Sequence, residues 1–181
     1  MLLISTVVLL IAVLFFVSLY NKGITLKNYV NEAFSTMDVY MKKRWDLIPN
    51  LLEITKGYME HEKEVFYEVT KLRNLNYSSM SEDEKMDVNN KLSLGLSKLI
   101  AVSENYPAIK SSENFKQMSS QLANIEGDIA KSRKYYNGCV REYNTYIAIL
   151  PSCLIAGMCN WTPYKFFEID GEQRENIQIK F

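Results

Sequence analysis

Residues that form turns are scarce in this sequence. Seven Gly and four Pro occur among 181 residues, whereas a β-sandwich, a barrel or a doubly wound sheet needs a turn signal about every dozen residues. This scarcity excludes those fold classes and predicts a few long helices. Hydrophobic residues make up 48% of the chain, which argues against disorder.

Groups suited to catalysis and metal binding are also few. The chain has one histidine, His61, and three cysteines without a CxxC spacing, which leaves no multi-histidine metal site and no disulfide framework. Lys and Arg equal Asp and Glu at 21 each, so the chain has no net positive field that would attract nucleic acid. We therefore expect a non-enzymatic protein with no cofactor, no metal and no nucleic-acid partner.

A long apolar run is the most prominent feature that is present. From Leu2 to Tyr20 the chain reads LLISTVVLLIAVLFFVSLY, without a charge or a proline. As a helix this run spans about 28 Å, close to the hydrocarbon thickness of a bilayer. A cleaved signal peptide would have a basic segment before the run and small residues at a cleavage site, and neither is seen. We predict a transmembrane anchor over residues 1–21, with Lys22 and Lys27 placing the following body in the cytoplasm.

Apolar residues at helical spacing, three or four apart, predict four further helices. The first two stripes comprise Leu26, Val30, Ala33, Met37 and Tyr40, and then Leu47, Leu51, Ile54, Tyr58, His61, Val65, Val69 and Leu72. The third, after a capping box at Ser81–Glu84, comprises Met86, Leu92, Leu96 and Leu99 and ends before Pro107. The fourth, between Ser112 and Pro151, comprises Phe115, Met118, Leu122, Ile125, Ile129, Ser132, Tyr136, Cys139, Tyr143, Tyr146 and Leu150.

The predicted fold is all-α. Short loops favour antiparallel neighbours, so residues 22–150 are expected to form an elongated four-helix bundle with coiled-coil-like packing. A dimeric coiled coil, and with it a homo-oligomer, is the competing assembly. Residues 151–181 are expected to begin with a helical turn and to continue as an aromatic tail lying extended on the bundle. A membrane-skimming or partner-binding tail is the alternative.

Two groups of residues are candidates for binding a partner. Lys42, Lys43 and Arg44 form the densest basic run, and about twenty helical residues, or roughly 30 Å, separate them from the bilayer. We expect them to form the turn between the first two helices, at a tip where Trp45 lies beside them. The second group is the aromatic part of the tail. It comprises Trp161, Tyr164, Phe166 and Phe167.

Polar residues on the predicted seam are given a structural role. They comprise His61, Tyr136, Asn137, Tyr143 and Asn144. Polar seam residues fix the register of packed helices, and a core histidine is the expectation for His61. The alternatives are a ligand-lined groove at the two Tyr-Asn pairs and a pH-sensitive element at His61.

The ordered motifs of the chain resemble those of the LemA family. They comprise Tyr20-Asn21 with Leu26, the run Met41–Leu51 (MKKRWDLIPNL), Lys56-Gly57-Tyr58, His61-Glu62, Glu104–Pro107, Asn114-Phe115, Glu126 with Ile129-Ala130 and Arg133, Tyr136-Asn137, Val140, Tyr143-Asn144-Thr145, Pro151 and Ala156. The chain departs from the family pattern at Gly127-Asp128 and Gly138-Cys139.

This resemblance implies a bacterial inner-membrane protein with a single span, its N-terminus outside and its helical bundle in the cytoplasm. It implies no established enzymatic activity, and some members of the family take part in forming magnetosome membranes. We therefore expect a scaffold or interaction module that contacts the lipid bilayer through residues 2–20 and also an unidentified membrane or cytoplasmic protein. The alternative is a membrane-tethered sensor or small-molecule-binding bundle that responds through its polar seam and His61.

Overall fold

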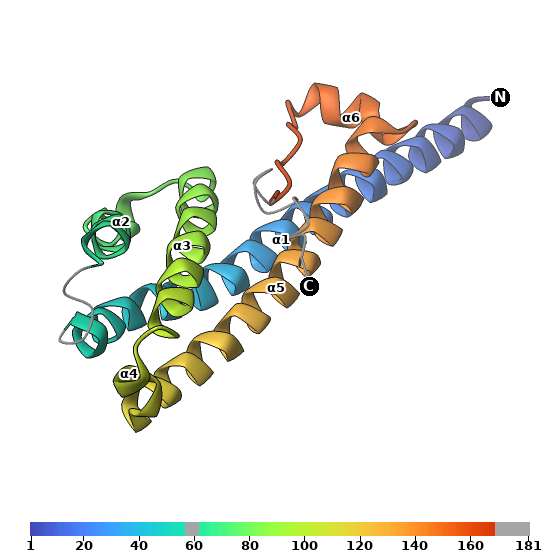
Figure 1. The fold of residues 1–181 in the computed structure, drawn as a ribbon. Coiled ribbons are helices and arrows are strands. Elements are labelled where there is room, and N and C mark those ends of the chain that lie inside the picture. The colour runs from blue at the N-terminus through green and yellow to red at the C-terminus, as the bar shows by residue number, and fades with distance from the viewer. Residues whose placement is uncertain (57–61, 169–181) are drawn as a thin grey trace, which may run out of the picture. The chain divides into compact units, whose positions relative to one another are not determined.

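The computed structural model describes residues 1–56 and 62–168. The described elements are α1 (Leu2–Lys56), α2 (Lys63–Arg73), the short 3-10 helix η1 (Tyr77–Ser79), α3 (Glu82–Ser103), α4 (Pro107–Ser111), α5 (Glu113–Ala148) and α6 (Ser152–Met158) (Figure 1). No strand occurs in this part of the chain, so the all-α prediction is confirmed. His61, and the tail beyond Glu168, lie outside the described residues.

The chain forms two compact units. Unit 1 comprises Met1–Met37 and Lys131–Phe167, and unit 2 comprises the described residues of Asp38–Ala130 together with Glu168. Helices α1 and α5 therefore each contribute residues to both units, whereas α2, α3 and α4 belong to unit 2 and α6 to unit 1.

Helix α1 corrects the prediction of a turn at the basic run. It continues without a break through Lys42, Arg44 and Pro49 to Lys56, so the first two predicted soluble helices begin as one. Proline in a helix interior costs about 3 kcal/mol through a lost hydrogen bond and a steric clash. Burial of Trp45, Ile48 and Leu51 on the inner face offsets that cost, because each such side chain contributes about 1.5–3 kcal/mol when removed from water.

Local sequence signals explain where the helices of unit 2 begin. Ser81 is the N-cap of α3, and its hydroxyl and the Glu84 carboxylate form the predicted reciprocal capping box. Pro107 does not merely end the third helix, because it also occupies the first turn of α4, where a missing N–H costs nothing. Helix α2 packs on α3 through Val69, which lies against Gly95.

Helix α5 follows its predicted stripe closely. Its buried residues include Phe115, Leu122, Ile129, Ser132, Tyr136, Cys139, Tyr143 and Tyr146. The predicted stripe is wrong at its end, because α5 stops at Ala148 and Leu150 is exposed. A turn at Ile149–Pro151 leads into α6, the helical turn expected at the start of the C-terminal segment.

Candidate functional site

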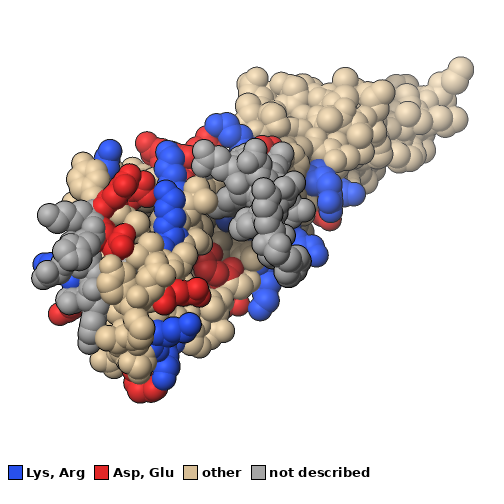
Figure 2. All heavy atoms as spheres, in the orientation of Figure 1, with Lys and Arg blue, Asp and Glu red and all other residues tan. Residues whose placement is uncertain are grey.

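The N-terminal third of α1 is an exposed apolar rod. Every residue from Leu2 to Ser18 is exposed, and this stretch is long and apolar enough to cross a membrane. Figure 2 shows this end of the molecule without a single charged side chain, in contrast to the mixed charges elsewhere on the face in view. An exposed apolar surface this large is unfavourable in water. It indicates that the protein associates with a membrane.

In unit 1, two asparagines of α5 hold the segment after α6. The Asn144 amide donates to the backbone oxygen of Tyr164 (2.8 Å), and its side-chain oxygen accepts from the Tyr164 N–H (3.0 Å). Asn137 makes the same pair of bonds to Phe167, at 3.0 and 2.8 Å. Each asparagine side chain thus forms the two hydrogen bonds to one backbone residue that a neighbouring β-strand would form. We call Asn137 and Asn144 the asparagine clamp.

The spacing of the clamp matches the segment that it holds. Seven helical residues advance about 10.5 Å, and three extended residues advance about 10 Å, so two asparagines one heptad apart meet residues 164 and 167 in register. From Trp161 to Glu168 the chain forms neither a helix nor a turn. This geometry explains why each asparagine follows a seam tyrosine by one position.

The tyrosines of the two pairs lie beneath the same segment. The Tyr136 hydroxyl donates to the backbone oxygen of Lys165 (3.0 Å), and the Tyr143 ring packs edge-on against the Tyr164 ring with centroids 5.3 Å apart. Both tyrosines are buried. Tyr136, Asn137 and Asn144 therefore bond to the chain's own backbone, and these polar groups are already used.

Trp161 contacts α1 next to the end of its apolar run. Its ring lies 5.8 Å from that of Tyr20, and it covers Gly23 so closely that a Cβ at that position would lie 2.0 Å from the indole Cζ3 atom. A residue without a Cβ is therefore needed at position 23 because the indole approaches so closely. The backbone angles of Gly23 do not require glycine, because its φ is not positive.

We expect Gly23→Ala to destabilise the protein, by about 1–3 kcal/mol, because the indole must move out of its site. Gly138→Ala, in the middle of α5 with open space around its Cβ, is the matched control. We expect it to stabilise the protein by about 0.5–1 kcal/mol, as Gly→Ala usually does in a helix. Thermal unfolding of the detergent-solubilised full chain measures both effects. A shift of the same sign in both variants would contradict this packing.

In unit 2, the guanidinium of Arg44 is fully buried among polar groups. It donates to the Ser93 hydroxyl (2.6 Å), to the backbone oxygen (2.8 Å) and side-chain oxygen of Asn89, and to the carboxylate of Glu126. Burial lowers the pKa of Arg44, and the charge of Glu126 opposes this shift. An arginine remains charged at neutral pH, so this cluster joins α1, α3 and α5 through a buried cation.

Trp45 lies beside a second polar group in unit 2. Its ring packs on that of Tyr77, with centroids 5.1 Å apart, and the Tyr77 hydroxyl donates to Asp38 (2.5 Å). Asp38 also pairs with Lys85 at 2.7 Å. Burial and the Asp38 carboxylate raise the pKa of Tyr77, so the tyrosine stays protonated and acts as a donor. These contacts hold α1 against η1, which contains Tyr77, and against the first turn of α3, which contains Lys85.

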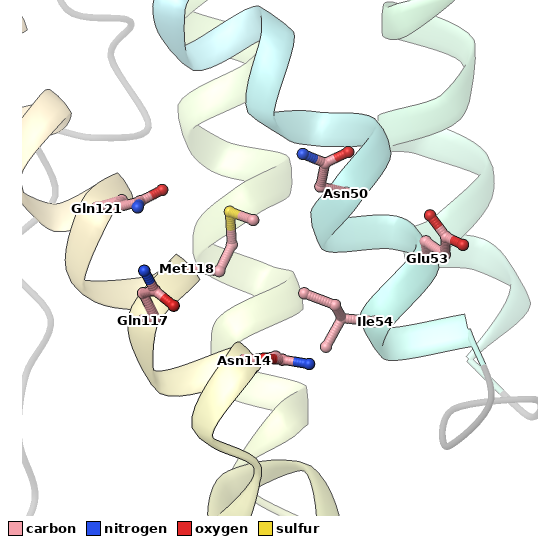
Figure 3. Close-up of a pocket in the computed structure, with 7 residues that line it drawn as sticks. All are labelled: Asn50, Glu53, Ile54, Asn114, Gln117, Met118 and Gln121. Carbon is pink, nitrogen blue, oxygen red and sulfur yellow. The ribbon is translucent and has the colours of Figure 1, made fainter.

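An open cleft in unit 2 is lined by amide side chains. It has a volume of about 370 Å³ and lies between the last turns of α1 and the first turns of α5 (Figure 3). Its lining residues are Asn50, Glu53, Ile54, Asn114, Gln117, Met118 and Gln121. In Figure 3 the amides of Gln117, Gln121 and Asn114 stand on α5, opposite Asn50 and Glu53. Such a surface offers donors and acceptors to a polar partner.

The candidate partner-binding residues are divided between interior and surface. Arg44, Trp45 and Phe167 are buried, Trp161 and Tyr164 are half-buried, and Lys43 and Phe166 are exposed. Lys42 forms a surface ion pair with Asp46. The basic run is therefore not a charged tip, because a continuous helix turns Arg44 inward and Lys43 outward. Reasoning from the sequence missed the Arg44 cluster and the amide-lined cleft.

Comparison with known proteins agrees with this architecture. A model of the LemA family matches residues 33–181. Magnetosome proteins MamQ 2 and MamQ 1 of Paramagnetospirillum magneticum are each 24% identical to the chain over 176 residues, which covers 82% of the chain and 64% of each relative. Magnetosome protein MamQ of Magnetospirillum gryphiswaldense is 23% identical over 175 residues, with the same coverage. The chain therefore spans less than two thirds of the length of these relatives.

The residues that the family model matches include the main polar clusters of both units. The match spans the buried Arg44 cluster of unit 2 and the asparagine clamp of unit 1, and it continues through the segment that the clamp holds. It also covers most of the chain that follows the apolar run. On this basis the chain belongs to the LemA family.

Proposed function

We propose that this protein is a non-enzymatic scaffold, or interaction module, anchored in the bacterial inner membrane by residues 2–20. The observation that carries the proposal is the exposed apolar third of α1, which is continuous with a helical body bearing mixed charges. A scaffold needs a fixed place at the membrane and surfaces for other proteins, and it needs no reactive side chains.

Its body is proposed to lie in the cytoplasm. Lys22 and Lys27 follow the apolar run on its C-terminal side, and basic residues next to a span favour the cytoplasmic face. Membrane organisation is the process that we propose, because the relatives are named magnetosome proteins.

The amide-lined cleft is the surface that we propose for a protein partner. Its open shape and its mixture of amide donors and acceptors suit a polar segment of another chain or of a second copy. Three of the eight residues predicted to bind a partner are less suitable, because Arg44, Trp45 and Phe167 are buried.

Photo-crosslinking in intact membranes tests the proposal. A photoreactive amino acid is placed at Gln117, which is exposed in the cleft, and a matched one at Asn124, which is exposed on the same helix outside the lining residues. We expect a discrete adduct, with a second copy or with another protein, only from position 117. If both positions give the same adducts, or neither gives any, the cleft is not a partner surface.

A membrane-tethered binding protein for a small polar molecule is the second candidate, and the same cleft is the observation that favours it. The cleft supports this candidate better than the polar seam does, because Tyr136, Asn137 and Asn144 of the seam already bond to the backbone of residues 165, 167 and 164. His61, the other residue of the predicted seam, lies outside the described residues. A metabolite that raises the melting temperature of the wild type and leaves that of Gln117→Ala unchanged would favour binding over scaffolding.

A further inference from the structure

The corner between α5 and α6 in unit 1 is unusual for a surface turn because it carries no charge. From Tyr143 to Tyr164 the chain has no Asp, Glu, Lys or Arg, and the nearest charged residues are Glu142 and Lys165. Turns between helices in water are ordinarily polar. Figure 2 shows this region as an uncharged surface continuous with the apolar third of α1.

The side chains that face outward at this corner are large and apolar. Ile149, Leu150, Leu154 and Met158 are exposed, Leu150 to 75% and Met158 to 82%. On the opposite side of α6, Ser152, Ile155 and Ala156 are buried. A helix that lies on a protein in water has a polar outer face. Helix α6 has an apolar one, so something other than water is expected to cover it.

Contacts within unit 1 place the corner beside the apolar run. The Tyr146 hydroxyl donates to the Leu19 backbone oxygen (2.5 Å), and Phe34 packs on Tyr136 with ring centroids 5.9 Å apart. As residue numbers rise along α5, the partners along α1 fall, so the two helices are antiparallel here. The two remaining residues of α5 therefore carry the chain about 3 Å further toward the N-terminus of α1 before the turn begins.

After the corner, Trp161 contacts the same part of α1 that Tyr146 contacts before the corner. Trp161 packs on Tyr20 and covers Gly23, while Lys22 lies over the Tyr146 ring at 5.7 Å. Tyrosine and tryptophan concentrate at the boundary between hydrocarbon and headgroups, and lysine lies on its aqueous side. Ile149 to Met158 thus lie, in the sequence, between two aromatic residues that both contact α1 at the end of its apolar run.

Polar backbone groups at the corner find partners within it. The Ser152 hydroxyl shares its proton between the backbone oxygens of Tyr146 (2.5 Å) and Ile149 (3.0 Å). The backbone N–H of Trp161 donates to the backbone oxygen of Ala156 (2.9 Å). The Cys153 N–H donates to the oxygen of Ile149 (2.8 Å). A segment can enter hydrocarbon only when its backbone groups are paired in this way.

We propose that the α5–α6 corner, residues 148–158, inserts into the bilayer beside α1 as a second lipid contact that does not cross the membrane. We call it the lipid wedge. The wedge is covered by the acyl-chain region of one leaflet, the leaflet in which the C-terminal end of the apolar run lies. The proposal rests on the proposed anchoring, because it takes the position of the membrane from residues 2–20. Its consequence is that the rod of α1 and the body of unit 1 are held at a fixed tilt and rotation in the membrane.

Quenching by lipids that carry a nitroxide on the acyl chain, near the headgroup in one set of vesicles and near the chain end in another, tests this placement, and the stronger quenching of the two is compared. The full chain, with Cys139, Cys153 and Cys159 replaced by alanine, receives one cysteine with an environment-sensitive fluorophore and is reconstituted into phosphatidylcholine–phosphatidylglycerol vesicles. The label is placed at Leu154 in the wedge, at Leu10 in the apolar run as a positive control, or at Lys134, which is exposed on α5, as a negative control. Circular dichroism confirms that each variant retains its helix content.

We expect the label at position 154 to be quenched to a degree close to that at position 10 and several-fold more than that at position 134. If position 154 behaves like position 134 while position 10 is quenched, the wedge is wrong and the anchor stands. If position 154 has a blue-shifted emission but is not quenched, a second copy covers the corner and the lipid proposal is overturned. If position 10 is also unquenched, the proposed anchoring fails together with the wedge.

Discussion

Replacing Arg44 by alanine is expected to lower the free energy of unfolding by about 3 kcal/mol. Removing one partner of a buried ion pair leaves the other groups without their charge partner, and this typically costs 3–5 kcal/mol. The lower end applies here because the Glu126 side chain is 40% exposed and can regain water. The Asn89 oxygens and the Ser93 hydroxyl lose a donor at the same time. Urea unfolding in detergent, followed by circular dichroism, measures the change.

Lys42 is the matched control for this variant. It precedes Arg44 by two residues on the same helix, and its ion pair with Asp46 is solvent-exposed. Such pairs contribute about 0–1 kcal/mol, so Lys42→Ala should change the stability by about 0.5 kcal/mol or less. Arg44→Lys keeps the positive charge and loses the planar guanidinium group. Its loss of stability is expected to lie between those of Lys42→Ala and Arg44→Ala. Equal losses for Lys42→Ala and Arg44→Ala would show that Arg44 is not buried as described.

Removing both clamp asparagines is expected to release residues 164–167. The Asn137→Ala and Asn144→Ala changes each delete two hydrogen bonds to the backbone. Leaving a donor or acceptor unpaired costs about 1–3 kcal/mol, and the two sites are far enough apart for their effects to add. Together they should weaken docking by about 2–4 kcal/mol, so the amides of Tyr164 and Phe167 should exchange with solvent at least about thirty-fold faster.

Hydrogen exchange on the full chain in detergent measures this release, with Asn124→Ala as the control on the exposed side of α5. Asn144→Asp separates hydrogen bonding from packing. The aspartate has nearly the same shape but presents an acceptor to the Tyr164 backbone oxygen in place of a donor. It keeps the acceptor for the Tyr164 N–H, so it should speed exchange at position 164 but less than alanine does. Unchanged exchange in both substitutions at Asn144 would contradict the clamp.

Much of the fold follows directly from local sequence signals. The stripe of α5 could be assigned because Phe115 to Tyr146 alternate by three and four residues without a break, and the start of α3 because Ser81 and Glu84 form a capping box. Family motifs pointed to the tyrosine and asparagine pairs of α5. They did not show what these residues hold, because the partner is a backbone segment twenty or more residues away.

The basic run predicts a turn only if Arg44 is a surface charge, and in the structure Arg44 is buried within one continuous helix, α1. The buried residues Met37, Met41, Arg44, Ile48, Leu51 and Thr55 repeat at spacings of four and three through the basic run. This pattern was present in the sequence and would have predicted one helix. Charge alone gave the wrong answer, since whether an arginine is buried depends on acceptors from α3 and α5, which are distant in the chain.

Leu150 was placed on the inward stripe of α5 because its spacing continued the pattern. The pattern could not show that the helix ends at Ala148 and that the following apolar residues face outward. Periodicity detects which side chains avoid water, but it does not distinguish a protein core from a lipid phase. The contacts of Tyr146 and Trp161 with α1 are the observations that support the proposed lipid contact.

The most direct test of membrane anchoring is extraction of native membranes with alkaline carbonate. The full chain, its N-terminal residues verified by mass spectrometry, should remain in the membrane pellet after both a high-salt wash and the alkaline wash. Leu10→Arg should reduce this fraction, since an arginine at the centre of a span costs about 2.5–3.5 kcal/mol. Recovery of the intact wild-type chain in the supernatant would contradict the account, because the exposed apolar third of α1 would then have no bilayer around it.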